Sequence, residues 1–161
     1  MSIRDIAMER IIEQHYTQTV IFETDRIIKS IKSVLIQYLN SLNLGITAEQ
    51  FMVLDAIYCN DGICQQELSQ LLLKDKSNTK RIVNVLENNG LIKIKLSKKN
   101  NRPVNKLNIT GAGKKIIDEN RDNVKNFALK MFKSVSEEDL VILKNIGHKI
   151  KDDLSCYIEN I

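Results

Sequence analysis

Apolar residues recur at steps of three and four over the first part of the chain, which is the spacing of one helical face. From residue 27 these residues are Ile27, Ile28, Ile31, Val34, Leu35, Tyr38, Leu39 and Leu42. Neither glycine nor proline occurs before Gly45. The pattern predicts helical structure over residues 1–44 that stops near Gly45, because glycine suits the position after a helix C-terminus.

Two shorter helices follow, and each is opened by a capping-box pattern, in which the N-cap residue and the third helical residue exchange hydrogen bonds. Thr47 and Gln50 form the first box, and this helix is expected to end near residues 60–62. Cys64 and Glu67 form the second box, with a cysteine in the usual place of serine or threonine. The helix that it opens is expected to end near residues 74–75.

A fourth helix is predicted from about Lys76 or Ser77 to Asn88, with a stop signal at residues 89–90. One face of this helix consists of Thr79, Ile82, Val83 and Leu86. The other face is polar and consists of Ser77, Lys80, Arg81, Asn84 and Asn88. Because the spacing within each set is helical, we expect the polar set to form one exposed face.

Apolar and basic residues alternate over residues 92–96, which is the period of a half-buried strand. A polar turn is predicted at 98–103, and a second strand-forming segment follows over 104–109. Together they predict a β-hairpin with a long, basic tip. Lys93 and Lys95 share one face of it, where they would either contact phosphates or protect a strand edge.

Helical spacing returns from Ile116 to Val135, after an opening at residues 110–113. Ser136 is the predicted N-cap of a last helix, which has three acidic residues in its electropositive first turn. The fold class predicted from all these elements is mainly α with a small β-hairpin, that is, α+β.

The composition, with 43% hydrophobic and 27% charged residues, is that of an ordinary globular protein. No apolar run approaches the roughly 20 residues of a membrane span, and the first residues lack a secretion signal. We therefore expect a cytoplasmic protein without a membrane partner. The three cysteines, Cys59, Cys64 and Cys156, favour reduced thiols over a disulfide framework, because their number is odd.

The charge is distributed unevenly along the chain. The formal net charge is +4, but residues 61–115 contain 12 basic and 4 acidic side chains. That middle segment therefore carries +8, and the rest of the chain carries −4. A basic segment between acidic ends favours a polyanion-binding module mounted on other elements.

Short helices, a basic hairpin and long flanking helices together indicate a winged helix-turn-helix domain at 45–110, between dimerisation helices at 1–44 and 111–161. A helix about 10–12 Å across fits the major groove of DNA. The hairpin would bring its cations to the DNA backbone or the minor groove. The residues expected to contact double-stranded DNA are Gln65, Ser77, Asn78, Thr79, Lys80, Arg81, Asn84, Lys98, Lys99 and Arg102.

Three segments resemble the multiple-antibiotic-resistance regulator (MarR) family of transcription factors. Residues 45–57 (GITAEQFMVLDAI) look like the second helix of the family. Residues 65–92 (QQELSQLLLKDKSNTKRIVNVLENNGLI) are similar to its helix-turn-helix, including the ending Leu-Glu-x-x-Gly-Leu. Residues 100–116 (NNRPVNKLNITGAGKKI) resemble its wing, where Arg102 matches the tip arginine that reaches toward the minor groove in the family. Asn101 and Pro103 depart from the usual Asp-Arg-Arg of that wing.

The resemblance implies a homodimer whose two recognition helices enter successive major grooves of a pseudo-palindromic operator. Most members of the family repress transcription, and many are released by small aromatic or phenolic effectors. Tyr16, Phe22, Tyr38 and Phe51 would suit an effector pocket, but core or dimer packing explains them more simply, so no effector site is assigned.

Other functions remain open at this point. The chain could be a ligand-independent DNA-binding protein, a winged-helix module for protein interaction, or a redox sensor acting through Cys64 at a helix N-terminus. A small buried residue explains Cys64 more simply. His15 and His148 are too far apart in the sequence to indicate a metal site. No catalytic or nucleotide-binding motif occurs, so we expect neither an enzyme nor a cofactor.

Overall fold

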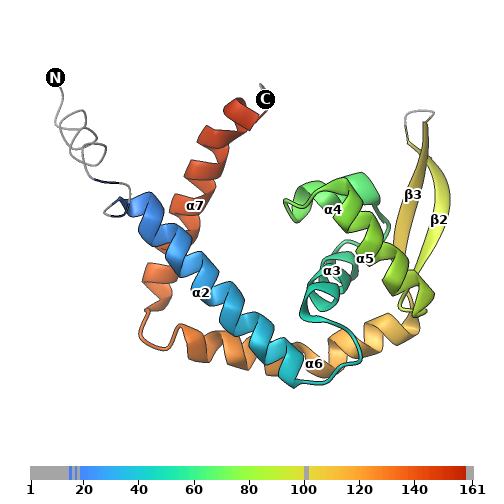
Figure 1. Ribbon diagram of the computed structural model, residues 1–161, viewed down its shortest axis with the longest axis horizontal. Coiled ribbons are helices and arrows are strands. Elements are labelled where there is room, and N and C mark those ends of the chain that lie inside the picture. The colour runs from blue at the N-terminus through green and yellow to red at the C-terminus, as the bar shows by residue number, and fades with distance from the viewer. Residues whose placement is uncertain (1–14, 16, 18, 100–101, 159–161) are drawn as a thin grey trace. The chain divides into compact units, whose positions relative to one another are not determined.

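The computed structural model of the chain describes residues 15, 17, 19–99 and 102–158 (Figure 1). Its elements are α2 (Val20–Ser41), α3 (Ala48–Cys59), β1 (Ile63–Cys64), α4 (Gln65–Leu71), α5 (Lys76–Asn88), β2 (Ile92–Lys99), β3 (Arg102–Ile109), α6 (Gly111–Met131) and α7 (Glu137–Ile158). They fall into two compact units, Met1–Asp122 and Asn123–Ile161. The predicted class, mainly helical with a small antiparallel sheet, is confirmed.

The predicted capping boxes form at the starts of α3 and α4. The Gln50 amide donates to Thr47 Oγ1 over 3.2 Å, and the Thr47 amide donates to Gln50 Oε1 over 3.0 Å. At α4 the Cys64 amide donates to Glu67 Oε2 over 3.0 Å. These local bonds satisfy amides that a helix leaves unpaired at its first turn, which is why the boundaries could be predicted.

The first helix described, α2, begins at Val20 and ends at Ser41, a few residues before Gly45. Gly45 has a φ of +72°, a left-handed conformation that glycine adopts without the steric penalty of a side chain. Across this turn the Ala48 amide donates to Asn40 Oδ1 over 3.3 Å. That bond joins the end of α2 to the start of α3.

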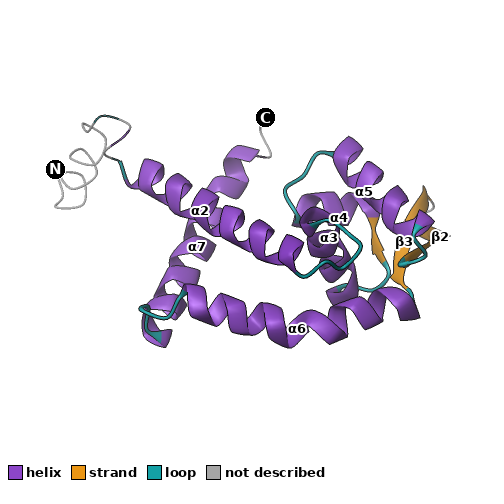
Figure 2. Ribbon diagram, turned by 60° about the horizontal axis from the view of Figure 1, so that its bottom comes forward, coloured by secondary structure: helices purple, strands orange, loops and turns teal. Residues whose placement is uncertain are grey.

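The core of the first unit lies between α3, α4, α5, the first turns of α6 and the sheet. Its largest fully buried side chains are Leu54, Ile57, Leu68, Ile82, Leu86, Ile92, Leu107, Ile117, Val53, Val83 and Thr79. Figure 2 shows α3, α4 and α5 gathered beside the strands. The apolar face predicted for α5 is therefore confirmed as its buried face.

The sheet has three antiparallel strands in the order β1-β3-β2. The strand β1 was not predicted, because a strand of two residues has too few positions to show a period. The turn expected at 98–103 was too long, since Lys98 pairs with Pro103 and Lys99 pairs with Arg102. Pro103 is tolerated because β1 pairs only as far as Lys106, so the missing amide removes no bond on that side.

In the second unit, Ser136 is the N-cap of α7 as predicted, since its Oγ accepts from the Asp139 amide over 3.1 Å. Several large apolar side chains of α7 are exposed to solvent, namely Val141, Ile142, Leu143, Ile146, Ile150 and Leu154.

Within the described part of the chain, no helix combines the length and the apolar character needed to cross a membrane.

Candidate nucleic-acid interface

The polar face of α5 consists of the exposed side chains of Ser77, Lys80, Arg81, Asn84 and Asn88. The helix begins after Asp75, whose Oδ1 accepts from the Asn78 amide over 2.7 Å. Because the opposite face is buried in the core, this face is held toward solvent. A rigid helix with exposed donors and acceptors has the size and chemistry that the major groove accommodates.

Thr79 does not belong to this surface, and its prediction as a DNA contact is wrong. Its side chain is fully buried, at 0% exposure, and its hydroxyl donates to the Asp75 carbonyl oxygen over 2.9 Å. The helical period places residue 79 on the buried side of α5, where a hydroxyl is satisfied by the preceding turn of the chain.

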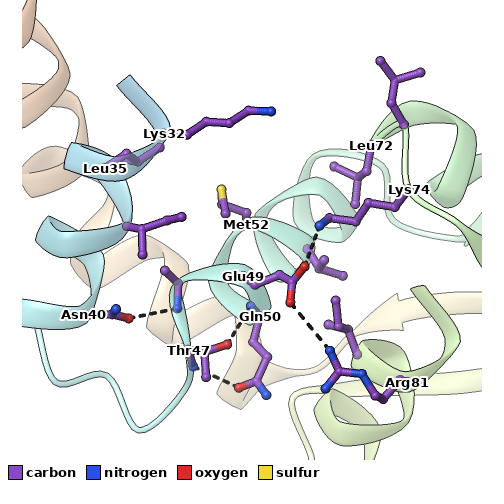
Figure 3. A pocket seen from close by; sticks show the side chains of 15 residues that line it. Lys32, Leu35, Asn40, Thr47, Glu49, Gln50, Met52, Leu72, Lys74 and Arg81 are labelled. Atoms are coloured by element: carbon purple, nitrogen blue, oxygen red, sulfur yellow. Dashed lines mark hydrogen bonds and ion pairs between the residues drawn. The ribbon is translucent and has the colours of Figure 1, made fainter. Parts of the chain in front are cut away.

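Asn78 is half-buried at the edge of the polar face, where it meets a residue that the sequence analysis missed. Glu49, in the first turn of α3, accepts a hydrogen bond from Asn78 Nδ2 over 3.4 Å and one from Lys74 Nζ over 2.6 Å. A guanidinium nitrogen of Arg81 lies 3.8 Å from the second carboxylate oxygen of Glu49 (Figure 3). The same nitrogen donates to Asn78 Oδ1 over 2.9 Å. The hydrogen bond from Lys74 is the main cause of a lowered Glu49 pKa.

The hairpin strands β2 and β3 together present a cationic face formed by Lys93, Lys95 and Lys106. Lys93 and Lys95 are exposed on β2, and Lys106 is exposed on β3 directly opposite Lys95. Like charges in directly opposed positions of an antiparallel pair destabilise it, so this arrangement suits a polyanionic partner. Lys106 was missed, because an isolated lysine in a mixed segment shows no pattern before the register is known.

The remaining predicted contacts are distributed along α4 and the hairpin. Gln65 is the first residue of α4 and is half-buried, and Lys98 is exposed on β2. Lys99 and Arg102 pair with each other across the hairpin, but their side chains lie outside the described part. The polar face of α5 and the hairpin therefore belong to the same compact unit.

Two acidic residues, also missed, fix the hairpin to the helices. Glu87 near the end of α5 accepts from the Ile94 amide of β2 over 3.2 Å. Asp61, after α3, accepts from the Ile109 amide over 2.9 Å and from Asn108 Nδ2 over 3.3 Å. Each carboxylate pairs with a strand amide, and so ties the direction of the hairpin to the helical core.

A cavity of about 650 Å³ opens between α2, α3 and the turn from α4 to α5 (Figure 3). Leu35, Met52 and Leu72 contribute apolar surface to it, and Lys32, Lys74 and Arg81 contribute positive charge beside Glu49. The aromatic residues considered for a pocket do not line it. Phe51 is in the core, Phe22 and Tyr38 are half-buried elsewhere, and Tyr16 lies outside the described residues.

The two other chemistries considered for the chain gain no support from the described residues. Cys64 is 8% exposed, as expected for a small buried residue, whereas Cys59 is exposed. No group of three or more potential metal ligands occurs in the described part of the chain.

Comparison with known proteins identifies the family. A family model described as MarR family matches residues 44–103. The uncharacterized HTH-type transcriptional regulator YybA of Bacillus subtilis (strain 168) is 30% identical over 115 residues, which cover 69% of this chain and 76% of the relative. The chain belongs to the MarR family. Members of this family are DNA-binding transcriptional regulators and not enzymes, so this chain is a DNA-binding transcriptional regulator.

Solved structures confirm the MarR fold. The S. aureus MepR–DNA complex is similar with a TM-score of 0.70 and 20% identity, over 87% of this chain and 99% of that chain. A mutant MarR from E. coli, complexed with operator DNA, is similar with a TM-score of 0.68 and 23% identity, over 85% and 99%. The winged-helix fold predicted from the sequence is thereby confirmed.

Within the segment 100–116, which resembles the wing of the MarR family, Thr110 and Gly113 have a clear structural role. The Thr110 hydroxyl donates to the Gly90 carbonyl oxygen over 2.7 Å and accepts from the Gly113 amide over 3.2 Å. A Cβ at Gly113 would lie 2.2 Å from the Leu91 carbonyl oxygen. Only glycine allows the start of α6 to pack so closely on the end of the helix-turn-helix.

Proposed function

We propose that this MarR family chain represses transcription as a homodimer bound to a pseudo-palindromic operator, and that a small aromatic or phenolic effector releases it. The observation that carries the DNA-binding part is the polar face of α5, held rigidly beside the cationic face of the hairpin. In this mechanism α5 enters the major groove, and the hairpin contacts the DNA backbone or the minor groove.

Arg81, Ser77, Lys80 and Asn84 supply the base contacts in this proposal. The guanidinium of Arg81 presents several donors in one plane and can bind the edge of a guanine bidentately. Lys93, Lys95, Lys98 and Lys106 supply contacts to phosphates, which hold the protein on any sequence. Two relatives of the same fold have been solved with DNA, which favours this mode for the present chain.

Exposed apolar surface on two of the long helices, α2 and α7, favours a homodimer. On α2 the exposed residues include Val20, Ile21, Ile27 and Ile28, with between 45% and 66% of each exposed. On α7 Ile146, Ile150 and Leu154 recur at steps of four and are about half exposed. Apolar surface of this extent is typical of an interface and costs free energy in water. A second copy of the chain would cover it.

The cavity beside α3 favours an effector that combines an aromatic ring with an anionic group. Its apolar lining suits a ring, and Lys32, Lys74 and Arg81 suit a carboxylate or a phenolate. An effector bound there would contact Arg81, one of the proposed base-reading residues. Binding to the cavity and binding to DNA would then be coupled through a shared side chain.

The test begins with selection of a tight duplex from a random double-stranded library by the wild-type protein. Its affinity, and that of a scrambled duplex, are then measured over a range of salt concentrations. The proposal expects a steep fall in affinity with salt, about 0.9 log unit per log unit of salt for each phosphate contact. A shallow dependence, with no preference for the selected duplex, would favour a protein-interaction module instead.

Repression and release are tested separately from binding. The selected duplex is placed at a promoter in a reporter strain, where the wild-type protein is expected to lower expression. Salicylate serves as the probe of a small aromatic anion in a release assay with the same duplex. If operator binding persists at saturating probe and across a panel of phenolic compounds, the chain is a ligand-independent DNA-binding protein.

A further inference from the structure

Glu49 lies on α3, outside the polar face of α5. Its carboxylate contacts Lys74, Asn78 and Arg81. Its Oε1 accepts from Lys74 Nζ and from Asn78 Nδ2, and its Oε2 lies 3.8 Å from a guanidinium nitrogen of Arg81. Asn78 completes the arrangement, since its Oδ1 accepts from the same guanidinium nitrogen over 2.9 Å. Figure 3 shows Glu49 between Lys74 and Arg81, with each pair joined by a dashed line.

The two ion pairs of Glu49 differ in strength. The Lys74 pair is short, at 2.6 Å, and only 26% of the Lys74 side chain is exposed. The Arg81 pair is long, at 3.8 Å, and 67% of the Arg81 side chain is exposed. An exposed pair at that distance contributes little to stability. The Lys74 ion pair therefore holds the Glu49 carboxylate in place. The contact with Arg81 orients the Arg81 side chain and leaves it exposed.

The amide of Asn78 is oriented by its two partners. Its nitrogen donates to Glu49 and its oxygen accepts from Arg81, so a flipped amide would lose both bonds. Only one of the guanidinium nitrogens of Arg81 takes part in these bonds. The other donors of the planar group stay available for a base edge or a phosphate.

We propose that Glu49 is a specificity-determining residue that positions Arg81 for a base edge through Asn78 and its own carboxylate. This inference rests on the proposed function, because it takes Arg81 as a base-reading residue. A restrained guanidinium loses less conformational entropy when it binds, so the contact with the correct base is strengthened. The same negative charge, close to the DNA-facing surface, weakens attraction to phosphates of any sequence. Glu49 therefore raises discrimination at some cost to general affinity.

The experiment compares wild-type protein with Glu49→Gln, using the selected duplex and a scrambled duplex at one salt concentration. The ratio of the two affinities is expected to fall about tenfold, which is the lower part of the range for one good base contact. The affinity for the scrambled duplex is expected to rise about twofold, because a negative charge is removed. Glu119→Gln, on α6, is the matched control, since it removes an equal charge from an exposed i,i+4 pair and should leave the ratio unchanged.

Two further variants test whether Glu49 affects discrimination through Arg81. In an Arg81→Ala background, Glu49→Gln should cause no additional loss of discrimination, because the side chain that it positions is gone. Glu49→Asp keeps the charge but shortens the reach, so it should lower the ratio without raising the affinity for the scrambled duplex. Glu49→Asp also carries the test if Glu49→Gln does not fold, as judged by circular dichroism.

The outcomes separate this inference from the function on which it rests. If Arg81→Ala lowers the ratio and neither Glu49 variant does, Glu49 does not position Arg81. The same conclusion follows if Glu49→Gln lowers the ratio equally in the presence and the absence of Arg81. If Arg81→Ala leaves the ratio unchanged, Arg81 does not read bases, and the proposed function loses its main contact together with this inference.

Discussion

The carboxylate of Glu87 accepts a hydrogen bond from the backbone amide of Ile94 over 3.2 Å, which ties the end of α5 to the first strand of the hairpin. The two elements proposed to contact DNA are thus joined by a hydrogen bond within the domain. Their relative direction is set inside the domain before any DNA is bound. Preorganisation of this kind lowers the entropy that binding must overcome.

Replacement of Glu87 by alanine should loosen this junction. We expect faster hydrogen exchange at the Ile94 amide and a loss of stability of about 1 kcal/mol, the usual net value of such a bond. Affinity for the selected duplex should fall because β2 is no longer tied to the end of α5. Exchange at the Ile109 amide, which Asp61 holds, is the internal control and should be unaffected.

Gly113→Ala should destabilise the domain, because the new Cβ would lie 2.2 Å from the Leu91 carbonyl oxygen. Overpacking of this kind typically costs about 1–3 kcal/mol. The urea unfolding midpoint measures the loss. Gly111→Ala, in the same helical turn but with no atom within 4 Å of its Cβ, is the control. Equal midpoints for the two variants would contradict the packing argument.

Lys106→Gln should change stability and DNA binding in opposite directions. It relieves the repulsion between Lys106 and Lys95, so the melting temperature should rise or stay the same. It also removes one proposed phosphate contact, so affinity should fall and the salt slope should decrease by about 0.9. Lys144→Gln, an equal charge change on α7, should leave the slope unchanged. A fall in both stability and affinity would place Lys106 in the structural framework rather than in the interface.

The apolar surface of α7 can be tested by Ile146→Glu and Ile150→Glu. If a second copy covers these side chains, each charge should lower the dimer fraction, because burying an unpaired charge is costly. Light scattering coupled to size-exclusion chromatography measures the mass. Asn145→Glu, at an exposed position that the helical period turns away from Ile146 and Ile150, should leave the mass unchanged. A monomeric wild-type protein would remove the basis of the homodimer proposal.

The Tyr58 hydroxyl donates to Asp118 over 2.7 Å, and this bond is the main cause of a raised Tyr58 pKa. A pKa raised in the folded state means that the bond stabilises the fold fully below the pKa of unfolded tyrosine, about 10. The contribution is lost as the pH rises through the folded value. Ultraviolet titration of wild type against Tyr58→Phe should show one tyrosine ionising late, and Asp118→Asn should bring its pKa back toward normal.

The local elements of this fold could be predicted because their signals are local. Thr47, Gln50 and Ser136 mark helix starts through bonds to residues three positions away, and the face of α5 follows from its period. The contacts made across the fold could not be predicted. Glu49 meets residues 25 to 32 positions later, and no sequence pattern joins them. Thr79 was predicted as a DNA contact although its helical period placed it on the apolar face, and the structure shows that the period was the better guide, because its side chain is fully buried.

The cationic face of the hairpin has a consequence for the free protein. The repulsion between Lys95 and Lys106 is screened by dissolved ions, so added salt should tighten the hairpin. The same ions compete for phosphates and weaken attraction to DNA. Ionic strength therefore has opposite effects on the free protein and on the complex with DNA. At high salt the hairpin is more stable but the affinity for DNA is lower, and at low salt the hairpin is less stable but the affinity for DNA is higher.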